Sequence, residues 1–138
     1  MPHEVNMPPG ALFAGEAKTL EFEILAAGQD PTNANATMQN VTGWALKWSL
    51  RKAVPGIAPH RQQGDEVLVK TTVTGITIVG TFNASRPLNT QRVRVLLAKA
   101  DTTSLLGGQY VHGLLRTDVG AEGMLTFGTV ALYVPAPR

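Results

Sequence analysis

Within the segment from Thr42 to Lys52, residues 44–51 alternate between large apolar side chains and small or polar ones. Four large apolar side chains occupy every second position: Trp44, Leu46, Trp48 and Leu50. A period of two is typical of a strand with one buried and one wet face. Both tryptophans of the chain lie on the buried side, and each can cover about 200 Å² of apolar surface. We therefore expect a strand here, at the centre of the core.

Composition limits the class of protein. A chain of 138 residues fits one domain, and 43% hydrophobic with 16% charged residues is typical of globular proteins. Cysteine is absent, so neither disulfides nor thiolate metal sites hold the fold. The net charge of +2 argues against nucleic acid as a partner, because such binding usually needs a clustered basic face. We expect no cofactor.

The N-terminal residues do not have the pattern of a secretory signal peptide. The first ten residues, MPHEVNMPPG, contain no basic region followed by an apolar stretch, so they are not a signal peptide. No apolar run approaches the ~20 residues that span a membrane. We expect a soluble protein that is made in the cytoplasm.

Six further segments have the alternation or composition of strands: 18–25, 66–72, 75–82, 92–98, 109–117 and 125–134. Thr74 and Gly75 between the second and third of these predict a hairpin. Residues 100–105 predict a single helical turn with Asp101 as N-cap, which ends at Gly107. Seven short strands without a long amphipathic helix favour an antiparallel β-sandwich, with a small barrel as the alternative.

The two ends of the chain differ from its middle. Prolines at positions 2, 8 and 9 resist regular structure and favour an extended N-terminal arm over residues 1–14. The sandwich domain is expected over residues 15–134, and a prolyl C-terminal tail over 135–138. Long polar loops are expected at 26–41 and 53–64.

Several segments together resemble a known family. They are GEAKTLEFEI (15–24), VTGWALKWSL (41–50), GITI (75–78), ADTTSL (100–105) with GQY (108–110), and GTVALYV (128–134). In this order they resemble small phage virion modules, of which the N-terminal domain of phage baseplate upper proteins is the best-known relative. The resemblance implies an immunoglobulin-like sandwich and a role in building a virus particle. Full baseplate proteins continue beyond this module, so we expect a capsid decoration or tail fitting, with a baseplate component as the alternative.

Catalytic motifs are weak. The histidines His3, His60 and His112 lack the short spacing of metal ligands, and His112 is interpreted as a structural or surface residue. No serine lies in a Gly-x-Ser-x-Gly elbow. Glu21 and Glu23 share a strand face, as a glycosidase pair could, but are more simply an outer strand face. We expect no enzymatic activity.

Four basic residues predict a stripe across neighbouring strands: Lys47, Arg51, Arg92 and Arg94. No aromatic residues interleave with them, so we expect contact with an acidic protein surface rather than with nucleic acid.

The hypothesis from the sequence is a non-enzymatic phage structural protein, made in the host cytoplasm and located in the virion. It would dock through its arm and sandwich surface onto capsid or tail subunits and form homo-oligomers. The proposed arm anchors are Pro8, Pro9, Leu12 and Phe13, because Leu12 and Phe13 are exposed apolar surface unless something covers them. The alternative is a carbohydrate or host-surface binding module that uses loops 26–41 and 53–64, which contain no aromatic residue.

Overall fold

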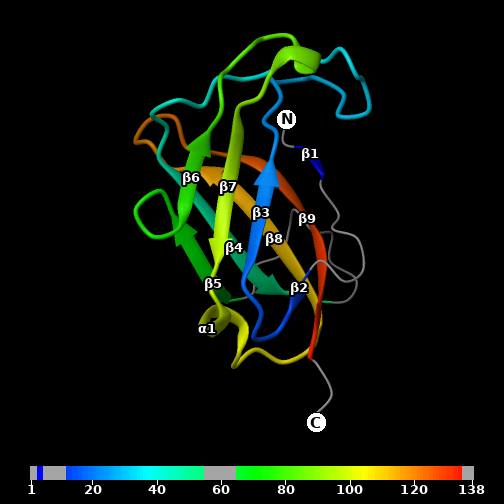
Figure 1. Cartoon of the computed structure of the whole chain (residues 1–138), viewed down its shortest axis with the longest axis vertical. Coiled ribbons are helices and arrows are strands. Elements are labelled where there is room, and N and C mark those ends of the chain that lie inside the picture. The colour runs from blue at the N-terminus through cyan, green and yellow to red at the C-terminus, as the bar shows by residue number, and fades with distance from the viewer. Residues whose placement is uncertain (1–2, 5–11, 55–64, 135–138) are drawn as a thin grey trace.

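Two β-sheets packed face to face make up the protein. The computed structural model describes residues 3–4, 12–54 and 65–134. Figure 1 shows the smaller sheet in front of the larger one, with a short helical turn, α1, at one end. The expected all-β sandwich is confirmed.

Among the described residues, the larger sheet has six strands. Its pairing order is β5 (Glu66–Thr71), β4 (Leu46–Lys52), β8 (Gly108–Arg116) and β9 (Gly123–Tyr133), all antiparallel. Two short strands, β1 (His3–Glu4) and β2 (Leu12–Phe13), run parallel to β9 at its free side.

The smaller sheet is antiparallel and has the order β3 (Lys18–Phe22), β7 (Arg92–Leu97), β6 (Ile76–Val79). The 3-10 turn η2 (Arg86–Leu88) precedes β7, and α1 (Lys99–Thr102) follows it. In the described part of the chain, this strand order matches that of an immunoglobulin-like β-sandwich. There, the strands named G, F, C and C′ face those named B, E and D.

The core lies between the sheets, where the period-two pattern predicts it. Leu46, Trp48 and Leu50 of β4 are fully buried, as are Val93 and Val95 of β7. One detail of the tryptophan strand differs, because β4 begins only at Leu46. Trp44 precedes the strand and packs half-buried against the core.

Three rings form the central tie between the sheets. The Phe22 ring of β3 lies 5.7 Å from the His112 imidazole of β8, and His112 stacks on Trp48 with ring centroids 6.5 Å apart. Antibody domains place a disulfide and a packed tryptophan in the equivalent strands. The Tyr110 hydroxyl also donates to the Leu106 carbonyl at 2.6 Å, as in the tyrosine corner of such domains. His112 is thus a buried structural residue.

The predicted hairpin is wrong. β5 pairs with β4 in the larger sheet, whereas β6 pairs with β7 in the smaller one. The connection closes through Thr74, whose N–H donates to the Thr71 carbonyl at 3.0 Å. Gly75 follows with φ +144°, a conformation that other residues rarely adopt. The chain therefore crosses from one sheet to the other at this turn.

Asp101 is not the N-cap of the helical turn, contrary to the prediction from the sequence. The turn begins at Lys99, and Asp101 is its third residue, whose carboxylate accepts the Ala98 N–H at 2.6 Å. It also accepts the Lys70 ammonium at 2.8 Å. Asp101 thereby ties α1 to β5.

The described part of the predicted arm belongs to the domain. β1 and β2 both pair with β9, and Leu12 is only 2% exposed within the main core. Leu12 was expected to be exposed unless something covered it, and its own domain covers it, because a parallel pairing with Leu132 carries it inside. Pro8 and Pro9 lie outside the described residues, as does the tail 135–138.

Candidate functional site

The two carboxylates that could have resembled a glycosidase pair are held by arginines. Glu21 lies 3.6 Å from Arg94 Nε on the neighbouring strand β7. Glu23 lies 3.2 Å from Arg86 Nε. Each carboxylate thus has its own cation, which favours the interpretation of an outer strand face.

The predicted basic stripe is wrong. Lys47 and Arg51 lie on β4 in the larger sheet, and both reach Glu66, at 3.0 and 3.6 Å. Arg92 and Arg94 lie on β7 in the smaller sheet. Because the pairs occupy different sheets of the sandwich, they cannot line up as one surface.

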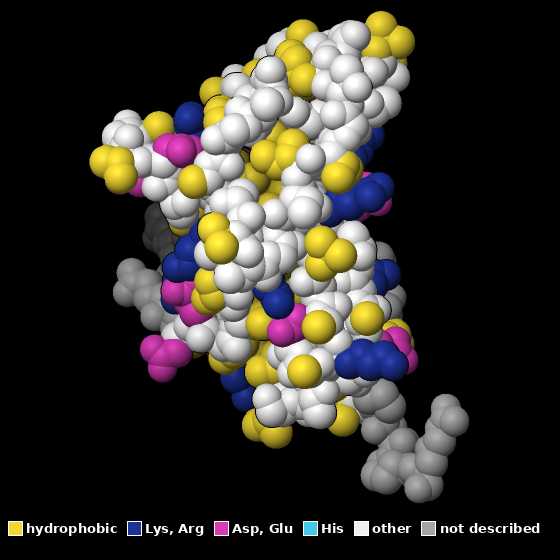
Figure 2. All heavy atoms as spheres, turned by 60° about the vertical axis from the view of Figure 1, so that its left-hand side comes forward, with side chains coloured by type: hydrophobic (Ala, Val, Ile, Leu, Met, Phe, Trp, Pro, Cys, Tyr) yellow, Lys and Arg dark blue, Asp and Glu magenta, His cyan; other side chains and the backbone are white. Residues whose placement is uncertain are grey.

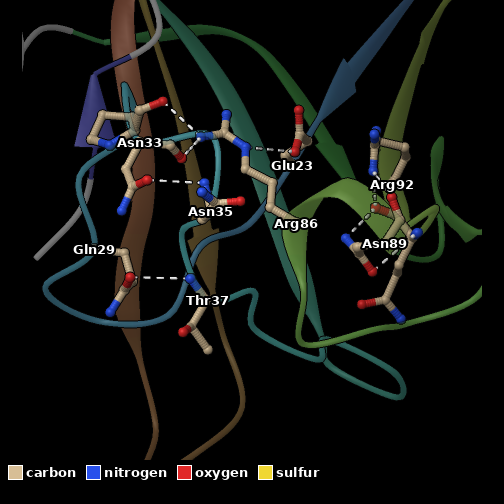
Figure 3. Close-up of polar contacts among 10 residues, drawn as sticks. Glu23, Gln29, Asn33, Asn35, Thr37, Arg86, Asn89 and Arg92 are labelled. Carbon is tan, nitrogen blue, oxygen red and sulfur yellow. Dashed lines mark hydrogen bonds and ion pairs between the residues drawn. The ribbon is translucent and has the colours of Figure 1, made fainter.

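The loop of residues 26–41 is fixed by one arginine (Figure 3). Arg86 Nη1 donates to the carbonyls of Pro31 and Asn33, both at 2.8 Å, while its Nε contacts Glu23. A guanidinium presents several donors in a planar fork, so one side chain can bind three acceptors at once.

The same loop has a small core of its own. Leu25, Ala36 and Met38 are buried together, and Phe82 packs against them. Leu25 and Met38 also form an antiparallel bridge, and the Met38 N–H donates to the Ala84 carbonyl at 2.9 Å. The polar loop is therefore a folded part of the domain, although its composition predicted only an irregular segment. We call the region that comprises the loop of residues 26–41, Arg86 and the small core of Leu25, Ala36, Met38 and Phe82 the loop end.

A pocket of about 190 Å³ lies beside the loop end. Its lining is mainly apolar and comprises Ile24, Leu25, Ala27, Gln39, Trp44, Met124 and Leu125. The Arg116 guanidinium lies over the Trp44 ring, 3.8 Å from its centroid. Asp118 fixes this arginine at 2.8 Å and accepts the Ala45 N–H at 3.0 Å. These bonds, the Arg116 bond first, hold the pKa of Asp118 below its usual value.

This pocket does not favour the sugar-binding alternative. A sugar site usually offers an open aromatic platform together with several polar groups. Here the Arg116 guanidinium covers one face of the Trp44 ring, and Gln39 is the one polar side chain of the lining.

The opposite end of the sandwich presents apolar side chains to solvent. Phe13 and Tyr133 are 38% and 43% exposed, and their rings lie 5.7 Å apart. Val134 is 57% and Leu106 is 71% exposed. A Cβ built on Gly107 would lie 3.3 Å from Val134 Cγ2, which shows that the Leu106 loop lies against the end of β9. We call these four residues (Phe13, Leu106, Tyr133 and Val134) the apolar end patch.

Hydrogen bonds hold this patch in place. The Ala14 N–H donates to the Tyr133 carbonyl at 2.8 Å, and the Gly15 N–H donates to the buried Thr102 hydroxyl at 3.0 Å. The Tyr110 hydroxyl fixes the Leu106 carbonyl. A surface that is rigid before binding loses little conformational entropy on docking.

The apolar end patch contains one of the four predicted anchors. Phe13 belongs to it, while Leu12 is a core residue and Pro8 and Pro9 lie outside the described residues. Sequence reasoning missed Tyr133, Val134 and Leu106. Tyr133 alternates out of phase with the buried Val130 and Leu132. An aromatic residue on the solvent-exposed face of the last strand could therefore have indicated this surface.

Residues 3–4, 12–54 and 65–134 carry neither a metal-ligand cluster nor a membrane-spanning helix. They contain no group of three His, Asp or Glu side chains that could hold a metal ion. No helix among them is long and apolar enough to cross a membrane. Comparison with models of known protein families gave no match, and comparison with curated protein sequences gave no similar protein.

Proposed function

We propose that this chain is a non-enzymatic structural protein of a phage particle, which docks onto neighbouring virion subunits through the apolar end patch. The ordered resemblance of its segments to phage virion modules supports the setting. A capsid decoration or a tail fitting is the role that we favour.

The apolar end patch carries the proposal. Single exposed apolar residues are common on protein surfaces, but clustered ones mark contact sites. Aromatic side chains are enriched at the centres of interfaces, and this patch has two in mutual contact, Phe13 and Tyr133. Because hydrogen bonds fix its backbone, the patch is preformed for docking.

The test compares two charge substitutions at opposite ends of the domain. A phage that lacks this protein would be complemented with the wild type, with Tyr133→Asp, or with the matched control Val119→Asp. Val119 is 98% exposed in the loop between β8 and β9, away from the patch. Mass spectrometry of purified particles would measure how much of the protein they contain.

We expect particles to contain the wild-type amount of Val119→Asp protein. The amount of Tyr133→Asp protein should be at least about tenfold lower, because a buried unpaired charge costs several kcal/mol at an interface. Thermal melting of both purified variants controls for folding. Normal incorporation of a folded Tyr133→Asp protein would contradict the proposal.

A further inference from the structure

A titratable side chain lies at the centre of the core. His112 is 1% exposed, and its ring contacts Phe22 of the smaller sheet and Trp48 of the larger one. Figure 2 would draw a described histidine in cyan, and no such side chain is visible on the face that it shows. Histidine ordinarily changes its charge near a pKa of about 6.5, closer to neutral pH than any other side chain. Protonation of His112 would therefore act directly on the contact between the sheets.

Apolar side chains make up most of the surroundings of this ring. Leu50 of β4 lies next to His112 in the larger sheet, and Gly128 of β9 lies on the other side without a side chain. Phe22, Val93 and Val95 of the smaller sheet are buried in the same core. An ion in such surroundings loses the water that stabilises it, so the neutral imidazole is favoured.

The ionisable groups of the described interior do not offer a counter-ion. On β8 itself, Tyr110 is buried, and burial raises the pKa of its hydroxyl, which stays neutral. On β5, Lys70 lies opposite Trp48 and binds Asp101 of α1 at 2.8 Å. The buried positions of β2, β3, β4, β6, β7 and β9 carry no charge, and no aspartate or glutamate is buried among residues 12–54 and 65–134. The inward side of the larger sheet thus presents a lysine to a protonated His112, and its nearby carboxylate is already engaged.

We propose that His112 makes the contact between the two sheets sensitive to acid: the sandwich stays closed while the imidazole is neutral and loosens when the imidazole takes up a proton. This inference goes beyond the proposed function and does not depend on it. Phe22, which packs on His112, belongs to β3, and β3 has β7 as its one neighbour among the described strands. Separation of β3 from the larger sheet would give the imidazolium access to water.

The direction of the effect follows from where the proton binds. Above about pH 6.5 the histidine is neutral in both the folded and the unfolded chain, and stability does not depend on it. Below that value the unfolded chain takes up a proton that the buried ring resists, so the free energy of unfolding falls with pH. The unfolding equilibrium constant should rise by up to about tenfold for each pH unit, until the folded ring is protonated as well.

The experiment separates His112 from the other two histidines of the chain, His3 and His60. A His3→Gln, His60→Gln double variant keeps His112 as the single imidazole, and NMR would follow the protonation of that ring in the folded protein. Urea denaturation from about pH 7 to about pH 5.5 would measure stability in a range where carboxylates, with a usual pKa of about 4, stay ionised. His112→Met removes the titration and keeps a large, adaptable apolar side chain.

We expect the wild type and the double variant to share one pH dependence, in which the unfolding equilibrium constant rises by up to about tenfold from pH 6.5 to pH 5.5. The folded His112 imidazole should remain mostly neutral at about pH 5.5, where an exposed histidine is mostly protonated. Folded His112→Met protein should show a flat profile over the same range.

Three results would overturn the inference. The imidazole of the folded double variant could be mostly protonated at about pH 5.5. The pH dependence could persist in His112→Met, or it could disappear in the double variant. Because the NMR measurement is made on a chain with the native His112, it decides the question even where His112→Met does not fold. The proposed function fails separately, through normal incorporation of Tyr133→Asp into particles.

Discussion

The two ends of this sandwich solve the same packing problem in different ways. At the loop end, Arg86 and a small core with Met38 at its centre close the loops onto the domain. At the other end, hydrogen bonds fix the backbone, but Phe13, Tyr133 and their neighbours remain in solvent. The loop end is therefore closed by its own contacts, although Leu88 beside Arg86 is 68% exposed, and the apolar end patch offers apolar area for a partner. Substitutions at the loop end should affect stability, and those in the patch should affect docking.

The largest expected effect is in the small core. Met38→Ala should lower the free energy of unfolding by about 2–4 kcal/mol, because Met38 is buried and its loss leaves a cavity. Urea denaturation measures the change, and limited proteolysis should cut within residues 26–41. Leu106→Ala in the patch is the control and should change stability by about 0.5 kcal/mol or less. Equal losses in both variants would refute the contrast between the ends.

Arg86 comes next. Arg86→Ala should cost about 1–3 kcal/mol, since the carbonyls of Pro31 and Asn33 lose their donor. Arg86→Lys keeps a charge near Glu23 but lacks the fork, so it should recover only part of the loss. Thermal melting of the three proteins would show the order. Full recovery with lysine would mean that charge alone fixes the loop.

Tyr110→Phe tests the opposite end. Removing the hydroxyl should cost about 0.5–1.5 kcal/mol, because the Leu106 carbonyl loses its bond while the buried ring stays in place. Burial raises the pKa of Tyr110, which is consistent with its enclosed position. Amide exchange should rise in the loop of residues 103–107 and stay unchanged in residues 26–41. A change in both regions would indicate that the two ends are coupled.

The last prediction concerns the loss of stability at low pH when Asp101 is protonated. Burial raises the pKa of Asp101, but bonds from Lys70 and Ala98 outweigh it and leave the pKa below the usual 3.8. The stabilisation is thus complete above the unfolded value and is lost as pH falls through the lower folded value. Denaturation at a series of pH values from 5 downward should show this loss in the wild type. Asp101→Asn should lack that part of the slope, and an identical slope would argue against the Lys70–Asp101 contact.

Alternation predicted which side chains are buried, but not which sheet a strand joins. Leu20, Phe22, Val93 and Val95 all lie inward as the period of two requires. The same pattern predicted a hairpin of β5 and β6, and it predicted a basic stripe of Lys47, Arg51, Arg92 and Arg94. Both interpretations failed because sheet membership depends on contacts between residues far apart in the chain.

The functional surface was harder to predict than the fold. Phe13 was expected at a docking site and does lie in the apolar end patch, although docking itself stays a prediction. Leu12 was placed wrongly because a two-residue strand has no periodicity of its own, and only its pairing with Leu132 buries it. Arg86 gave no local signal either, since its acceptors lie more than fifty residues away in the sequence.

The tie of Phe22, His112 and Trp48 has a practical consequence. Domains of this topology that depend on a covalent cross-link need an oxidant before they are sturdy. Here aromatic contacts take its place, and no sulfhydryl exists to be reduced or scrambled. Dithiothreitol should leave the melting curve unchanged. The domain should therefore fold to its full stability under reducing conditions.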